Sequence, residues 1–355
     1  MNSSSKRVLW WGRFDADYSR NRIVRQLFVA LGWEIIDFHP AISSLGDIEA
    51  YIRNFVHIDL VWLPCFRQRD VTAARRWANT KKVPLVFDPL ISAYDKQVWE
   101  RNKFSERSKQ ANKLLKWERT LFQSVDYLVA DTELHAEFYA DKMQVDNAKI
   151  TVLPVGAEES LFMPQGDTEL HQPLRILFYG SYIALQGPEI IAEAIRLYDG
   201  PDIEWQFIGD GPLRKKVQDS LQKLNNVHFT DWVPYADLAK KIAQADICLG
   251  VFGPTEKTQR VIPNKVYQAL ACARPVITSE SPVYPLQLRQ KNDLGLFFVP
   301  ANDAEALANK IAELAEQPER VLNSRKTAHE SYQRYFSNVV LQNSLIHLLE
   351  QIDRL

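Results

Sequence analysis

The sequence predicts an α/β protein of two doubly wound domains, each built on a parallel sheet. Three observations predict this fold class. Short apolar runs alternate with longer amphipathic segments, several runs are apolar at consecutive positions, and the alternation restarts after residue 173. Strands that are apolar at every position are typical of parallel sheets covered on both faces. The length of 355 residues suits two domains of ordinary size.

Six apolar runs in the first half of the chain are predicted strands. They comprise residues 8–11, 34–38, 60–63, 85–87, 127–130 and 150–153. The helix-like segments between them comprise residues 21–31, 72–80, 109–122 and 133–141. We therefore expect residues 1–165 to form a Rossmann-like domain.

The same pattern of strands and helices restarts in the second half. The predicted strands comprise residues 175–179, 205–208, 227–229, 247–251, 276–278 and 296–299. The intervening segments again look helical, and one helical face carries Ala304, Leu307, Ala308, Ile311 and Leu314. We expect residues 166–335 to form a second Rossmann-like domain.

The boundary between the two expected domains lies within residues 154–173. This stretch contains three prolines, two glycines and several acidic residues, and it has no sustained period, so we interpret it as a linker. Residues 318–335 and 337–355 are expected to be the last two helices. We treat residues 336–355 as a separate helical segment that packs back on the N-terminal domain.

Composition excludes several classes of protein. A formal net charge of −1 argues against a nucleic-acid binder, because such proteins carry a strong basic excess. The three cysteines form no C-x-x-C pair and read as reduced core residues. No apolar stretch approaches the roughly 18 residues of a membrane span. We expect a cytoplasmic protein, either free or attached to the inner face of the membrane.

The sequence offers no pattern for a metal or another cofactor. The seven histidines are scattered, without an H-x-x-x-H or Cys/His set. Asp15 and Asp17 form a D-x-D, but it follows the first strand of a Rossmann-like domain, which is the wrong context for a metal–diphosphate site. We therefore expect metal-independent chemistry and no cofactor.

Three loops of the second half are candidates for binding an anion. Gly180-Ser181 and Gln186-Gly187 lie between a predicted strand and a helix that opens at Pro188. Such a loop presents backbone N–H groups and a positive dipole end to a phosphate, although a tight structural turn gives the same pattern. Gly209-Asp210-Gly211 follows the next strand and also reads as ordinary turn chemistry.

The third loop leads into a helix and carries two cations. Arg260 and Lys265 flank Pro263, which opens the helix. Cations beside a helix N-terminus oppose the dipole, so they destabilise the helix unless an anion is bound there too. This loop therefore predicts an anion site.

The order of these segments resembles the C-terminal domain of retaining GT-B glycosyltransferases of the large family four, the group 1 glycosyl transferases. The motifs that carry the resemblance are Gly180…Gly187, Gly209-Asp210-Gly211-Pro212-Leu213, Asp231-Trp232-Val233-Pro234-Tyr235, Ala245-Asp246-Ile247-Cys248-Leu249, and residues 264–276 from Asn264 to Val276. The N-terminal half is similar to a bacterial subgroup through Gly12-Arg13-Phe14-Asp15, residues 18–22, Phe87-Asp88-Pro89-Leu90, Asp131-Thr132-Glu133 and Leu153-Pro154-Val155-Gly156-Ala157-Glu158. The resemblance spans nearly the whole chain. It implies a GT-B fold of two facing Rossmann-like, doubly wound parallel-sheet domains with C-terminal helices.

The same resemblance implies a hexosyltransferase that moves a sugar from a nucleotide diphosphate donor to an acceptor, with retention of configuration. The acceptor class it implies is a glycan, a lipid-linked saccharide or a small hydroxyl compound, in polysaccharide biosynthesis. The implied donor-binding residues are Gly180, Ser181, Gln186, Gly187, Gly209, Asp210, Gly211, Val233, Pro263, Asn264, Val266 and Gln268.

The chain departs from the family pattern in the phosphate-binding residues. The family's Arg and Lys of the first loop fall at Ser181 and Gln186, and its acidic pair falls at Arg260 and Gln268. We hypothesise that Arg260 and Lys265 take over the diphosphate and act catalytically, while Gln268 hydrogen-bonds ribose hydroxyls. The alternatives are a noncatalytic nucleotide-sugar-binding protein and a GT-B epimerase.

Residues at strand ends of the first half are candidates for the acceptor. Asp88 ends a strand before Pro89 and is the predicted catalytic side chain of this domain, although a turn-initiating Asp reads the same way. Gly12, Asp15, Arg22 and Asp131 are the other acceptor-binding candidates. Asp131 also reads as an N-cap.

Residues 67–119 carry fourteen Lys or Arg against six Asp or Glu. Lys109, Lys113 and Lys116 share this region with Leu114 and Trp117. Such a surface suits an anionic membrane or a lipid-phosphate acceptor, and it also fits an ordinary solvated helix face.

Overall fold

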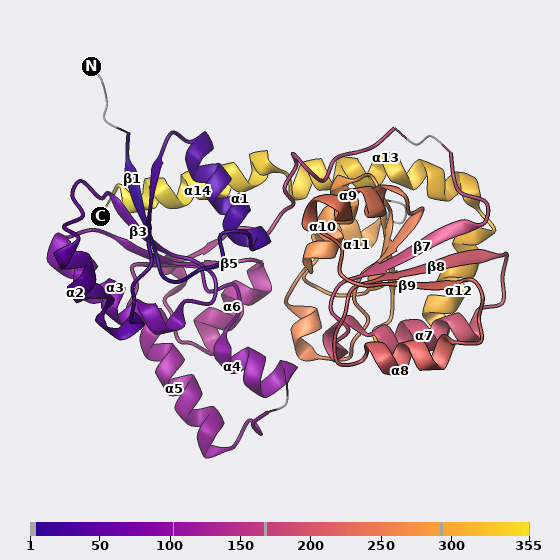
Figure 1. Cartoon of the computed structure of the whole chain (residues 1–355), viewed down its shortest axis with the longest axis horizontal. Coiled ribbons are helices and arrows are strands. Elements are labelled where there is room, and N and C mark those ends of the chain that lie inside the picture. Colours follow the sequence, from indigo (N-terminus) through magenta and orange to yellow (C-terminus); the bar gives the residue numbers. More distant parts are fainter. Residues whose placement is uncertain (1–4, 102, 167–168, 292–293, 355) are drawn as a thin grey trace. The chain divides into compact units, whose positions relative to one another are not determined.

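The computed structural model describes residues 5–101, 103–166, 169–291 and 294–354 (Figure 1). The chain forms two compact units, one of Met1–Val155 with Asn338–Leu355 and the other of Gly156–Ser337. Each unit contains a six-stranded sheet in which the strands run parallel, with helices packed against it. The predicted α/β fold of two doubly wound domains is confirmed.

The sheet of the N-terminal unit has the strand order β2-β1-β3-β4-β5-β6. Its strands are β1 (Arg7–Trp11), β2 (Glu34–Phe38), β3 (Leu60–Leu63), β4 (Leu85–Phe87), β5 (Tyr127–Ala130) and β6 (Ile150–Val152). In β1, Val8 pairs with Ile35 of β2 on one side and with Leu60 of β3 on the other. The strand order therefore reverses beside β1.

The helices of the N-terminal unit are α1 (Ser19–Ala30), α2 (Gly46–Ile52), α3 (Val71–Lys81), α4 (Ala93–Asp95), α5 (Lys109–Gln123), α6 (Glu133–Asp141) and α14 (Asn338–Ile352), with a π-helical turn at Lys96–Glu100. Some of these helices, α5 and α6 among them, begin at a side-chain cap, whereas α1, α2 and α3 have no side-chain cap. The Ser108 hydroxyl accepts a hydrogen bond from the backbone N–H of Ala111, and Thr132 caps α6 through the N–H of His135 in the same way. These caps satisfy N–H groups that the first helical turn leaves unpaired.

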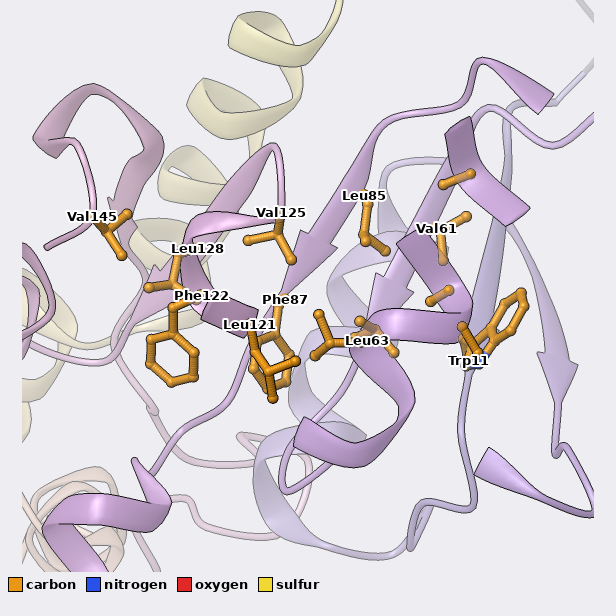
Figure 2. Packing of buried hydrophobic residues seen from close by; sticks show 14 of the residues in the cluster. Trp11, Val61, Leu63, Leu85, Phe87, Leu121, Phe122, Val125, Leu128 and Val145 are labelled. Atoms are coloured by element: carbon orange, nitrogen blue, oxygen red, sulfur yellow. The ribbon is translucent and has the colours of Figure 1, made fainter. Parts of the chain in front are cut away.

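Apolar side chains cover both faces of the N-terminal sheet. On one face Trp11, Leu63 and Phe87 pack with Leu121 and Phe122 of α5 (Figure 2). On the other face α1 and α14 pack against side chains that include Trp10 and Trp62. The last helix of the chain thus completes the core of the first unit.

The sheet of the C-terminal unit has the strand order β12-β11-β10-β7-β8-β9. Its strands are β7 (Leu174–Tyr179), β8 (Ile203–Ile208), β9 (Val227–Thr230), β10 (Ile247–Leu249), β11 (Val276–Ser279) and β12 (Leu296–Val299). Its helices are α7 (Pro188–Leu197), α8 (Arg214–Leu221), α9 (Tyr235–Ala243), α10 (Asn264–Ala271), α11 (Leu286–Gln290), α12 (Ala304–Ala315) and α13 (Pro318–Tyr335). The order reverses between β7 and β10, which is the Rossmann arrangement.

The two units divide after Val155, earlier in the chain than the domain boundary expected at residues 165–166. The reason is that the segment after Val155 packs on the C-terminal unit. The N–H of Ala157 donates to the Tyr332 hydroxyl (3.3 Å), and the Phe162 ring lies edge-on to Tyr235 (5.3 Å between centroids). Asp167 and Thr168 of the expected linker lie outside the described residues.

Helix α2 has no counterpart among the helices predicted from sequence. It has seven residues, and Ile48 and Ile52 on it are exposed while Gly46 and Ala50 are buried. Its apolar side chains therefore do not mark a buried face, which is the signal on which helix prediction relies.

Among the residues that the structure describes, no helix combines the length and the apolar character that a membrane span requires.

We predict that Leu345→Ala lowers the free energy of unfolding by about 2–5 kcal/mol, because Leu345 of α14 is fully buried against the N-terminal sheet. Val339→Ala, on the same helix and 65% exposed, is the matched control and should change it by less than about 0.5 kcal/mol. Urea unfolding of both variants measures the effect. Equal stability of the two variants would contradict this role of α14.

Candidate functional site

The loops at the reversal point of the C-terminal sheet are joined to each other. Residues 180–187 follow β7 and residues 250–253 follow β10. The N–H of Phe252 donates to the carbonyl of Gln186 (3.3 Å), and the N–H of Gly253 donates to that of Leu185 (3.2 Å). Ligands of open α/β sheets bind outside the carboxyl ends of the strands at this reversal.

The loop after β8 packs on the loop after β7 through Gly209. A Cβ atom at this position would lie 2.2 Å from the carbonyl oxygen of Gly180, and Gly209 has a φ of +121°. Only glycine fits both the contact and the backbone angle. The N–H of Gly180 donates to Ile208 (3.0 Å) and that of Tyr182 to Asp210 (3.0 Å). The backbone direction at Gly180 is therefore fixed from two sides.

Lys265 approaches the same point from α10. A Cβ atom built on Gly180 would lie 3.4 Å from the Lys265 Nζ. The Lys265 side chain is buried, and its Nζ lies 4.0 Å from the centroid of the Phe178 ring without a hydrogen-bond partner in the described part of the chain. The backbone carbonyl of Lys265 accepts a hydrogen bond from the Tyr179 hydroxyl (2.7 Å), which ties the start of α10 to the end of β7.

Burial decides the electrostatics of this lysine. Desolvation holds the pKa of Lys265 well below its usual range, because the charged form has lost its hydration and gained no carboxylate. A dianionic ligand beside the Nζ would reverse this by supplying the missing charge. The geometry is that of a buried amine that an anion bound beside it would return to the protonated form.

Gln186 brings a second polar group to the same place. Its Oε1 is buried without a hydrogen-bond partner among the described residues, and it lies 4.0 Å from the Cβ position of Gly180. Two buried polar atoms thus converge on one glycine, and unsatisfied buried polar atoms are uncommon in folded proteins. This convergence marks the candidate site.

The other predicted donor-binding residues at and before the start of α10 differ in burial and in hydrogen bonding. Gln268 is nearly buried, one turn after Lys265. Asn264 and Pro263 are partly exposed at the helix opening. The Val266 side chain is fully buried, and the Val266 N–H already donates to the carbonyl of Pro263 (2.9 Å). Neither the side chain nor the N–H of Val266 is therefore available to a ligand.

The remaining predicted donor residues lie in neighbouring loops of the same unit. Arg260 precedes α10, and its Nη1 lies 3.8 Å from the exposed carboxylate of Glu256. Ser181 and Val233 are half-buried, and Asp210 is exposed 3.9 Å from Arg214. A role of these residues in binding stays a prediction.

At the corresponding edge of the N-terminal sheet, Asp88 is buried and paired. Arg20 of α1 donates through its Nε to the Asp88 carboxylate (2.8 Å) and through its Nη1 to the carbonyl of Pro154. Arg20 is 0% and Asp88 2% exposed, and burial raises the pKa of Asp88 against the opposing effect of Arg20. No sequence motif predicted that Arg20 would pair with Asp88. A catalytic role of Asp88 stays a prediction.

The remaining acceptor candidates of this unit are in different settings. The Asp131 carboxylate is buried and bonded to His135 Nδ1 (2.5 Å), while Thr132 caps α6, so Asp131 is not the N-cap. Asp15 is exposed and accepts from the N–H of Asp17 (2.9 Å), and Arg22 lies 3.3 Å from the Asp17 carboxylate. In the parts of the chain that are described, no group of three His, Cys, Asp or Glu side chains is placed to hold a metal ion.

Comparison with protein families matches residues 173–317 to the family described as "Glycosyl transferases group 1". Among curated proteins, the amylovoran biosynthesis glycosyltransferase AmsK of Erwinia amylovora is 26% identical over 58% of this chain and 51% of its own length. The putative colanic acid biosynthesis glycosyltransferase WcaL of Salmonella typhimurium is 24% identical over 58% of this chain and 52% of its own. The chain spans about half the length of these curated relatives.

Solved structures share the fold over nearly the whole chain. Anabaena Alr3699/HepE in complex with UDP has a TM-score of 0.72 at 14% identity, covering 97% of this chain and 99% of that one. The sucrose-phosphate synthase tll1590 of Thermosynechococcus elongatus has a TM-score of 0.75 at 18% identity, covering 99% and 100%. The predicted GT-B fold is confirmed.

We predict that Lys265→Met stabilises the protein near neutral pH and that its advantage shrinks as the pH rises. Between the lowered pKa of folded Lys265 and the ordinary value of 10.5, the unfolded chain holds a proton that the folded chain does not. The free energy of unfolding of the wild type therefore rises with pH in this window. Urea unfolding of both proteins at several pH values measures the difference. A difference that does not change with pH would contradict the lowered pKa.

Proposed function

This chain belongs to the group 1 glycosyl transferases, and from that premise we propose that it transfers a sugar from a UDP-sugar to a hydroxyl group of a saccharide acceptor in polysaccharide biosynthesis. The names of its relatives support the process, and the UDP and UDP-glucose complexes of Anabaena Alr3699/HepE support the donor. The resemblance noted in the sequence supports retention of configuration.

The observation that carries the proposal is the buried amino group of Lys265 beside Gly180, which has no hydrogen-bond partner among the described residues. Breaking a glycosyl–diphosphate bond places negative charge on the leaving phosphate oxygen. A preorganised cation in a dry site stabilises that charge more than it stabilises the intact donor. Lys265 becomes such a cation when it takes up a proton on binding the diphosphate, and Gln186 next to it can accept a hydrogen bond from a sugar hydroxyl.

The lysine also explains how the chain manages without the usual residues of the first loop. Ser181 and Gln186 stand where the family resemblance places an Arg and a Lys, and the Lys265 side chain reaches this loop from α10. The positive charge has moved from one loop to the next, while its place next to Gly180 is kept. In this proposal Arg260 adds a second cation.

A nucleotide-sugar-binding protein without transferase activity is the second candidate. It is favoured by one observation, the neutral Gln268 on α10 where the family places an acid. An amide hydrogen-bonds hydroxyl groups but supplies no negative charge. Binding of UDP-glucose without hydrolysis or transfer would favour this candidate over the enzyme.

We predict that Lys265→Met lowers the rate of UDP-glucose hydrolysis or sugar transfer by about 100–1,000-fold, the usual effect of losing one donor to a developing anion. UDP binding should also weaken, and calorimetry in buffers of different ionisation enthalpy should show proton uptake by the wild type alone. Lys215→Met on α8, where the side chain is 86% exposed, is the control and should behave as wild type. Unchanged kinetics of Lys265→Met would remove this lysine from the site.

We also propose that the N-terminal unit associates with anionic membranes through α5. Lys109, Lys113 and Lys116 are exposed on this helix, and Trp117 beside them is 40% exposed. Exposed lysines near an anionic lipid surface contribute about 1 kcal/mol each.

The expected result is sedimentation with vesicles that contain phosphatidylglycerol and not with phosphatidylcholine vesicles. Replacing the three lysines by Gln should abolish it, whereas Lys215→Gln in the C-terminal unit should not. Equal sedimentation with both kinds of vesicle would contradict the proposal.

A further inference from the structure

A cavity of about 600 Å³ lies in the N-terminal unit beside the ends of β1 and β3. Arg13 follows β1, Arg67 follows β3, and Ser43 follows β2 on the adjoining edge of the sheet. Thr72 of α3 and Trp117 of α5 also line it. This volume is within the range of sites that hold a small molecule.

The lining of this cavity is positively charged. Arg13, Arg67 and Arg69 all contribute to it, and none of the described residues that line it is acidic. Neighbouring arginines outside the lining are neutralised: Arg75 pairs with Asp126 (2.8 Å) and Arg76 with Asp47 (2.6 Å). The cavity therefore collects cations that the surrounding surface does not compensate.

Arg67 is held in a fixed position. Its Nη1 donates to the carbonyl of Arg13, its Nε donates to that of Phe66 (3.0 Å), and the Nε lies 3.7 Å from the buried Asp70 carboxylate. Its chain crosses Gly12, where a Cβ atom would lie 2.6 Å from the Arg67 Cδ at a φ of +129°. Gly12 is thus required for the course of this side chain.

Arg13 and Arg69 supply the uncompensated charge. Both side chains are exposed, and neither forms an ion pair within the residues that the structure describes. The buried Asp70 carboxylate interacts electrostatically with Arg67 and, more weakly, with Arg13, so one carboxylate faces a group of three guanidinium side chains and a net positive charge remains for a ligand. Guanidinium groups bind carboxylates and phosphates through paired hydrogen bonds.

One wall of the cavity is apolar and aromatic, while Ser43, Ser44, Gln68 and Thr72 add polar groups elsewhere in the lining. Trp117 is 40% exposed, and Leu121 below it is buried in the core shown in Figure 2. An exposed indole presents a flat apolar face with a polar edge. The C–H face of a pyranose ring packs on such a surface, whereas a free inorganic anion gains nothing from it.

We propose that this cavity binds the acceptor, and that the acceptor sugar carries an anionic group, either a carboxylate or a phosphate. Arg13 and Arg69 bind the anion, and Trp117 packs against the sugar ring. This inference rests on the proposed function, since it assigns the charge class of the acceptor to a protein that we take to be a transferase. It goes beyond that function, because nothing in sugar transfer itself requires an acidic acceptor.

The test measures binding directly and without any sugar nucleotide. The probes are cellobiouronic acid, the uncharged cellobiose of the same shape, and glucose 1-phosphate, titrated into the full chain by calorimetry or NMR. We expect at least one acidic probe to bind about tenfold or more tightly than cellobiose, and its affinity to fall with added salt. The carboxylate and phosphate probes distinguish the two sources of the anion.

Variants separate the two parts of the site. Arg13→Ala and Arg69→Ala should each weaken the acidic probe about tenfold while leaving cellobiose unchanged, and Trp117→Ala should weaken both ligands. Arg107→Ala, an exposed arginine outside the cavity, is the control and should change neither. UDP affinity and the thermal unfolding midpoint show that each variant is folded.

Equal affinity for acidic and neutral probes, absence of binding of both acidic probes, or unaltered selectivity of Arg13→Ala and Arg69→Ala would overturn the inference. UDP-glucose binding and turnover test the transferase proposal separately. A protein that turns over UDP-glucose but does not prefer acidic saccharides would refute only the role of the cavity. A protein that selects acidic saccharides but does not bind UDP-sugars would refute only the proposed function.

Discussion

The C-terminal unit keeps the amino group of Lys265 away from water with no carboxylate beside it in the described part of the chain, and its loops are arranged around this group. Burying an ionisable group without a partner is costly, because the group must give up its proton or its hydration, so a fold retains one only where another requirement is served. Here the strand reversal between β7 and β10 brings three loops together. Gly209 allows the loop after β8 to touch the backbone at Gly180, and Lys265 reaches that same residue from α10. The consequence is a site in which a bound anion would allow Lys265 to take up its proton.

At the corresponding edge of the N-terminal sheet, by contrast, buried charged groups are paired. Arg20 and Asp88 neutralise each other in the interior, and Glu118 accepts hydrogen bonds from the Ser92 hydroxyl and from the N–H groups of Ala93 and Tyr94. These buried groups have their partners within the unit and hold the strand-end loops in place. The uncompensated charges of this unit lie instead at the surface, in the arginine-lined cavity. A transferase would use one unit to bind a nucleotide diphosphate and the other to bind a saccharide. The unpaired basic group is buried in the C-terminal unit and the unpaired basic groups are at the surface in the N-terminal unit, which fits the division that we propose.

Sequence patterns predicted the strands well because a buried parallel strand is apolar at each position, as in Leu60–Leu63. They also predicted an anion site at the loop from Arg260 to Gln268, since cations at a helix opening conflict with the dipole, and this site stays a prediction. They did not show that Lys265 lies against Gly180, because that contact joins residues far apart in the chain and depends on the strand order. The sequence did not predict the ion pair of Arg20 with Asp88 for the same reason. This pair joins the start of α1 to the residue after β4, and β2 and β3 lie between them in the chain.

The sequence located the linker within residues 154–173 but not the point at which the units divide, and the arginine-lined cavity had no sequence signal of its own. Residues after Val155 have the composition of a linker, yet Ala157 and Phe162 pack on the C-terminal unit through contacts with α13 and α9. Arg13, Arg67 and Arg69 are ordinary surface residues by composition, and only the fold gathers them. The basic excess of residues 67–119 pointed to the region but not to a cavity within it.

The most direct measurement of the central claim is a crystal structure of this protein with bound UDP-glucose. The account predicts that the diphosphate lies at the carboxyl ends of β7 and β10, with Lys265 Nζ about 2.7–2.9 Å from a phosphate oxygen. A diphosphate bound away from Gly180, with Lys265 still unpartnered in the interior, would contradict it.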